Sequence, residues 1–154
     1  HTRLISEFGG LAKVMPLFSI MLMIVSLSSI GLPGLNGFIG EFLILLGVFK
    51  STYLGNWYAI IAATGVIFAA VYLLWMYQRV IFGKVTNPEN QRLTDLSTRE
   101  VLVLAPIILF IVWIGVYPGT FLKVSSAKTK QIVTVARMYT TPQVSPVQTR
   151  RPVK

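Results

Sequence analysis

Residues 31–41 read Gly31-Leu-Pro-Gly-Leu-Asn-Gly-Phe-Ile-Gly-Glu41 and lie within an apolar run that extends from Pro16 to Phe49. The run contains 34 residues (16–49), whereas about 20 are enough to cross a bilayer core. Two geometries absorb the excess: two spans that turn at residues 33–37, or one crossing built from two half-helices. Residues 37–49 are few for an independent span, so the second geometry is favoured.

The composition of this stretch predicts a break in a helix. Pro33 has no N–H to donate and disfavours helical geometry at the residue before it. Gly34 and Gly37 allow backbone angles that other residues resist, and Asn36 can satisfy a freed backbone group. A broken helix at membrane depth is tolerated where it is buried in protein or lines a wet cavity. The break therefore predicts a site within a helix bundle.

Glu41 is the only charged residue of the apolar run. A charge at the centre of a membrane helix costs about 3 kcal/mol on insertion scales, which makes an intramembrane carboxylate a functional candidate. Burial favours its neutral form and a nearby cation or freed amide favours the anion, so Glu41 is predicted to take up and release protons. A packing hydrogen bond between helices, or a place near the headgroups, is the alternative. The other two apolar segments offer no Lys, Arg or His at membrane depth, so a charged partner is expected from outside this sequence.

The composition indicates an integral membrane protein, because 54% of the residues are hydrophobic and only 12% are charged. The formal net charge is +9, but half of the 14 Lys and Arg residues follow Leu122, so a basic tail explains the charge better than nucleic-acid binding does. With no Cys and a single His, no metal site is expected. The glycine spacing matches neither a dinucleotide fingerprint nor a phosphate loop, so no cofactor site is expected.

The chain divides into six predicted segments. They are a polar loop (1–15), a discontinuous transmembrane helix (16–49), a transmembrane helix (56–82), an aqueous loop (83–98), a third transmembrane helix (99–122) and a basic tail (123–154). Within the tail, Lys123 to Met138 is predicted to form a short basic amphipathic helix on the membrane surface. Because the chain begins at His1 without an initiator Met, it is expected to be a segment of a longer polypeptide or a split subunit.

Smaller signals refine the predicted helix ends. Trp57 and Tyr58 at one end of the second span, with Trp75 and Tyr77 at the other, are typical of aromatic belts at the two membrane surfaces. In the aqueous loop, Asp95, Leu96 and Ser97 are expected to offer caps to the third span.

The segment from Ile30 to Gly47, which contains the quoted stretch, strongly resembles the proton-translocating subunit M, or chain 4, of NADH-quinone oxidoreductase, respiratory complex I. Weaker matches occur in the same order along the chain, at 1–3, 9–11, 79–83, 99–100 and 115–118. The resemblance covers roughly residues 1–122, and the tail from Ser125 does not share it.

The resemblance implies an all-α integral membrane fold that corresponds to the last three helices of a fourteen-helix antiporter-like subunit. It implies a share in coupling NADH oxidation and quinone reduction to proton pumping, with Glu41 as a proton relay and the helix break at Pro33, Gly34, Asn36 and Gly37. It further implies no redox chemistry or cofactor in this chain, since flavin, iron-sulfur clusters and quinone belong to other subunits. The expected partners are other membrane-arm subunits, the missing N-terminal helices and the lipid bilayer.

Two other functions remain open. Subunits of multisubunit cation/proton antiporters and of membrane-bound hydrogenases share this fold, and a structural membrane scaffold would use Glu41 only for packing. The expected location is an energy-coupling membrane, with the bacterial plasma membrane favoured over the mitochondrial inner membrane.

Overall fold

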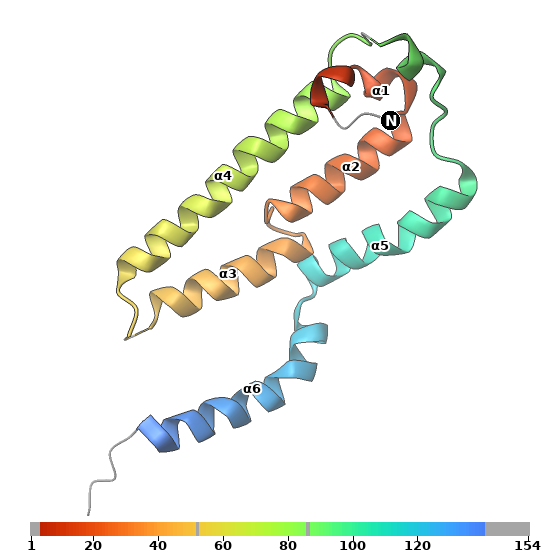
Figure 1. Ribbon diagram of the computed structural model, residues 1–154. Coiled ribbons are helices and arrows are strands. Elements are labelled where there is room, and N and C mark those ends of the chain that lie inside the picture. Colours follow the sequence, from red (N-terminus) through yellow and green to blue (C-terminus); the bar gives the residue numbers. More distant parts are fainter. Residues whose placement is uncertain (1–3, 52, 86, 141–154) are drawn as a thin grey trace, which may run out of the picture. The chain divides into compact units, whose positions relative to one another are not determined.

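A computed structural model describes residues 4–51, 53–85 and 87–140. Every regular element in these ranges is a helix (Figure 1), so the predicted all-α class is confirmed for this part of the chain. The α-helices are α1 (Leu11–Val14), α2 (Pro16–Ser29), α3 (Asn36–Phe49), α4 (Asn56–Ile81), α5 (Thr98–Val116) and α6 (Gly119–Thr140), and the short 3₁₀ helices are η1 (Ile5–Glu7) and η2 (Pro88–Arg92). The chain separates into two units, residues 1–118 and 119–154.

In the first unit, α2 and α3 follow one another in the same general direction, and α4 returns alongside both (Figure 1). Both α2 and α3 contact α4, and both contact α5. At about 1.5 Å per residue, the 26 residues of α4 extend about 39 Å, and α2 and α3 together have a similar length. Two half-helices therefore pack along one long helix.

Several observed bounds differ from the predicted segments. The segment predicted as a polar loop (1–15) contains η1 and α1. Leu11 of α1 is buried against the end of α4. The third apolar helix ends at Val116, before the predicted end at 122, since Pro118 has no N–H to continue the ladder. A second helix, α6, then begins at Gly119 and includes the start of the basic tail.

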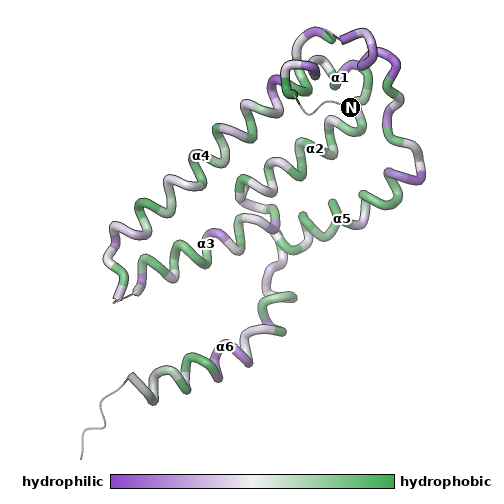
Figure 2. The backbone as a smooth tube through the Cα atoms, in the orientation of Figure 1, coloured by the Kyte–Doolittle hydropathy of each residue, from purple (hydrophilic) through white to green (hydrophobic). Residues whose placement is uncertain are grey.

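By length and composition, α4 and α5 can each cross a membrane, with a mean hydropathy of 2.2. Only 6% of the apolar window of α4 and 11% of that of α5 are buried. A core helix of a soluble protein would be mostly buried, so these faces need lipid or other helices to cover them. Figure 2 shows the apolar colouring along α2 to α5 and the mixed colouring of α6.

The buried apolar cluster lies at one end of the first unit and consists of Leu11, Tyr77 and Ile81. Tyr77 is only 5% exposed, and its hydroxyl donates a hydrogen bond of 2.9 Å to the Ser19 carbonyl of α2. Tyr77 therefore faces a neighbouring helix, and its place in a membrane-surface belt stays a prediction. The Tyr77 side chain joins α4 to α2, whereas the Trp75 ring is half exposed.

The N-terminus of α2 is capped from far along the chain. Asp95 accepts hydrogen bonds from the backbone N–H of Leu17 (2.8 Å) and of Phe18 (3.1 Å). Ser97 alone caps α5, in a capping box with Glu100. The prediction that this loop caps α5 was thus right for Ser97 and wrong for Asp95, which anchors the loop to the broken helix.

This cap predicts a pH dependence of the α2 N-terminus. Partial desolvation opposes ionisation, but the N–H groups of Leu17, Leu96 and Phe18 together hold the pKa of Asp95 below its ordinary value. The folded pKa is thus below the unfolded pKa of about 3.9. The stabilisation that ionised Asp95 gives to the folded state is therefore complete above the unfolded pKa. It is lost as the pH falls through the lowered folded pKa.

Hydrogen exchange of the Leu17 and Phe18 amides at different pH values measures this effect. We expect Asp95→Asn to accelerate exchange at neutral pH, because one amide oxygen replaces the two carboxylate oxygens that accept these bonds. Glu89→Gln removes a charge from the same loop without touching the cap and should leave both amides protected. Equal exchange in the two variants would contradict the assignment.

Candidate functional site: the helix break and Glu41

The break between α2 and α3 begins with a glycine that ends α2. Gly31 has φ 79°, its N–H donates to the Ser28 carbonyl, and the Leu32 N–H donates to the Leu27 carbonyl. This pair of bonds is the Schellman arrangement, in which a left-handed glycine follows the helix and satisfies its last carbonyls. Pro33 and Gly34, with φ 94° at Gly34, then carry the chain to Asn36, where α3 begins.

Ser28 joins the two half-helices. Its hydroxyl donates to the Asn36 side-chain oxygen across the break. Its carbonyl lies so close to Gly37 that a Cβ on Gly37 would overlap it. Asn36 therefore pairs with a side chain, whereas the sequence had suggested a freed backbone group. The glycine at 37 is required for close approach of α3 to the end of α2.

The backbone of α5 packs directly on the break. A Cβ added to Gly115 would overlap the Gly34 carbonyl and the Cα of Leu35. This contact brings together residues about 80 positions apart in the sequence. The packing of α5 therefore holds the non-helical segment in place, in addition to the contacts that Ser28 makes.

Glu41 lies on α3, and its carboxylate reaches back to the break. A Cβ built on Gly31 would overlap Glu41 Oε2, so the carboxylate lies directly against the Gly31 backbone. The side chain is half-buried. Among the described residues, no hydrogen bond or ion pair reaches this carboxylate. An ionisable group with open hydrogen-bonding capacity is thereby held at the junction of two half-helices.

The electrostatics of the break favour a negative charge at this place. Side chains on a helix lean toward its N-terminus, which is the positive end of the helix dipole. The N-cap residue of α3, Leu35, provides no side-chain bond to the first N–H groups. The Glu41 carboxylate therefore lies close to an end of α3 that attracts anions.

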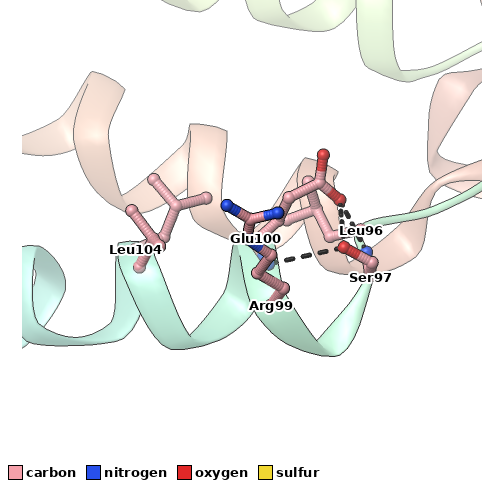
Figure 3. Close-up of a pocket in the computed structure, with 6 residues that line it drawn as sticks. Leu96, Ser97, Arg99, Glu100 and Leu104 are labelled. Atoms are coloured by element: carbon pink, nitrogen blue, oxygen red, sulfur yellow. Dashed lines mark hydrogen bonds between the residues drawn. The ribbon is translucent and has the colours of Figure 1, made fainter.

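A hollow at the start of α5 has a different character from the helix break. It is lined by Leu96, Ser97, Arg99, Glu100, Val103 and Leu104. Figure 3 shows that Ser97 and Glu100 bond to one another there, as the capping box requires. Its polar groups thus serve the helix end. Within the described ranges, no group of three His, Cys, Asp or Glu side chains could hold a metal ion.

The structure places Pro33 and Gly34 in the break and Asn36, Gly37 and Glu41 on α3. Sequence reasoning missed the roles of Ser28, Gly31 and Gly115. The signal for Gly31 was present, since a glycine shortly before a proline marks the end of a helix. For Ser28 and Gly115 there was none, because their roles depend on which segment packs against them.

Comparison with known proteins gives the family. The family model described as "NADH:quinone oxidoreductase/Mrp antiporter, TM" matches residues 1–71, which include the break and Glu41. NADH-quinone oxidoreductase subunit M of Rhodobacter capsulatus is 42% identical over 119 residues, which are 77% of this chain and 23% of that subunit. The chain belongs to the subunit M, or chain 4, family. The resemblance predicted from residues 30–47 is thus confirmed.

Other members of the subunit M family agree. The NADH-ubiquinone oxidoreductase chain 4 of Marchantia polymorpha is 41% identical over 132 residues, which cover 86% of this chain and 26% of the relative. Among solved structures, respiratory complex I from Thermus thermophilus with bound NADH contains a similar chain. It has a TM-score of 0.68 and 34% identity, covering 76% of this chain and 24% of that one. The present chain thus spans about a quarter of the length of these relatives.

Proposed function

We propose that this chain contributes to an antiporter-like, proton-translocating membrane subunit of NADH-quinone oxidoreductase. In this proposal α2 and α3 cross the membrane once as a discontinuous helix, and α4 and α5 form two further crossings. The chain would then correspond to the last three helices of a fourteen-helix subunit. The packing of both half-helices along the single helix α4 supports one crossing, since two separate spans would each need about 20 residues.

Glu41 is proposed as a proton relay, and the observation that carries this proposal is the contact of its carboxylate with the break at Gly31. Freed backbone groups, the positive end of α3 and a carboxylate meet there. Non-helical backbone at membrane depth is tolerated where it is buried in protein or lines a wet cavity. The groups that would pass protons to and from Glu41 are proposed to lie on other helices of the complete subunit.

The remaining assignments follow from this proposal. Flavin, iron-sulfur clusters and quinone would be held by other subunits, and this chain would take part in the enzyme as one component of a translocase. Its partners would be the other membrane-arm subunits, further helices of its own subunit and lipid. The location would be an energy-coupling membrane, with the bacterial plasma membrane favoured over the mitochondrial inner membrane.

Glu41→Gln in the assembled complex tests the relay. The glutamine preserves size and polarity but carries no exchangeable acid proton, and loss of a proton-transfer group slows that step by about 10²- to 10⁴-fold. We expect normal assembly and retained NADH oxidation with strongly reduced proton translocation into vesicles. Glu89→Gln, in the aqueous loop, is the matched control and should pump normally.

The outcomes separate the candidate functions. Normal pumping by Glu41→Gln would exclude the relay, and failure of the complex to assemble would favour a structural role for Glu41. The family description also names Mrp antiporters, so a cation/proton antiporter subunit is the second candidate, with a membrane-bound hydrogenase subunit as a further alternative. Purification of the chain with antiporter or hydrogenase subunits, and without NADH-oxidising ones, would support that candidate.

A further inference from the structure

The second unit contains a long helix with charge of one sign. α6 extends from Gly119 to Thr140, and this segment includes Lys123, Lys128, Lys130 and Arg137 but no acidic residue. Cations without compensating carboxylates create a positive field that attracts anionic surfaces. The helix therefore has the charge that an anionic partner requires.

The same helix carries an exposed apolar stripe. Val124, Ile132 and Val135 recur at the spacing that places residues on one face. Val124 is 82% exposed and Ile132 is 69% exposed. Ser126 and Thr134 lie on the opposite face, together with Lys123 and Lys130. An apolar stripe of this kind, backed by a cationic face, is typical of helices that lie in the plane of a membrane surface.

We infer that α6 docks lengthwise on an anionic lipid bilayer, with the stripe of Val124, Ile132 and Val135 in the headgroup region. This inference rests on the proposed crossing of the membrane by α5, because α6 begins three positions after α5 ends. The link is too short to take the start of α6 far from the bilayer. Small aliphatic residues beside charges of one sign suit an anionic lipid surface. A protein groove that bound the same helix would need a complementary acidic rim.

Lys128 is the residue of the stripe that we expect to contact the lipid headgroups. It falls in the stripe itself, between Val124 and Ile132. A Lys can lay its methylene stem along an apolar surface while its ammonium reaches polar groups. On a docked helix, Lys128 would thus reach the headgroup phosphates, whereas Lys123 and Lys130 would face the solution. Lys128 should therefore contribute more to docking than Lys123 does.

The absence of Cys allows single spin labels on the full chain in lipid vesicles. Val124→Cys, Ile132→Cys and Val135→Cys report on the stripe, and Ser126→Cys and Thr134→Cys report on the opposite face. With phosphatidylglycerol in the vesicles, we expect stripe labels to collide with oxygen, which is soluble in lipid, and opposite-face labels to collide with a water-soluble nickel complex. Lys128→Gln should lower the ratio of docked to undocked helix by about fivefold. Lys123→Gln removes the same charge from the other face and should change the ratio less.

The controls separate this inference from the proposed function. A label at Ile107→Cys on α5 should be accessible to oxygen, and its exposure to nickel would mean that the proposed crossing fails. If Ile107 lies in lipid while the stripe collides with nickel as freely as Ser126 does, docking alone is overturned. Protection of the stripe from both reagents would instead mean that protein covers it, which also overturns the inference. Equal docking on purely phosphatidylcholine vesicles would overturn the requirement for anionic lipid.

Discussion

Replacing Gly31 with alanine is expected to displace the Glu41 carboxylate and to reduce proton translocation by the assembled complex. An alanine at the left-handed φ of 79° costs about 1–2 kcal/mol. Its Cβ would also overlap Glu41 Oε2, and a flexible side chain escapes such overlap by turning away. A displacement of about 1 Å at a reacting group can cost about 100-fold in rate. Proton translocation per NADH oxidised, compared at equal assembly, measures the effect.

Gly34→Ala is the matched control for this prediction. Gly34 has φ 94°, so alanine there pays a similar backbone cost, but its Cβ would meet nothing within 4 Å. We expect the two variants to lose similar stability and only Gly31→Ala to lose translocation. Adding Glu41→Asp, which shortens the acid, should restore part of the activity in Gly31→Ala. Equal translocation in both single variants would show that the Gly31 contact does not position Glu41.

Local chemistry accounts for where the helices begin and end. The absence of an N–H in Pro33 and the left-handed backbone of Gly31 and Gly34 explain the break. Long uncharged segments likewise indicate α4 and α5. Each of these features depends on residues only a few positions apart, so the sequence alone could predict them.

Features that depend on distant segments could not be predicted in this way. Asp95 stands two residues before the Ser97 cap and has every local property of a cap for α5, yet it bonds α2. Tyr77 has the composition of a belt residue, yet α2 offers it the Ser19 carbonyl. In both cases the side chain has more than one suitable use, and tertiary packing selects one. The direction of the Glu41 carboxylate toward Gly31 is of the same kind.

Replacing Gly115 with alanine is expected to destabilise the packing of α5 on the break. Gly115 lies in the last turn of α5, so the gain in helix propensity from alanine is at most the value of about 1 kcal/mol for a helix interior. Here its Cβ would overlap the Gly34 carbonyl and the Leu35 Cα, which are backbone atoms and cannot turn away. Overpacking of this kind typically costs about 1–3 kcal/mol. The overlap should therefore outweigh the gain in helix propensity, and the free energy of unfolding should fall.

Gly65→Ala on α4 is the control, because it is expected to change the free energy of unfolding in the opposite direction. A Cβ at Gly65 would meet nothing within 4 Å, so only the propensity gain of about 1 kcal/mol remains. Unfolding of the two variants in mixed micelles with increasing dodecyl sulfate should show Gly115→Ala below the unsubstituted chain and Gly65→Ala at or above it. If Gly115→Ala were as stable as Gly65→Ala, α5 would not rest on the break. Since the Gly34 carbonyl that α5 contacts lies three residues from Gly31, Gly115→Ala should also shift the surface against which Glu41 is held.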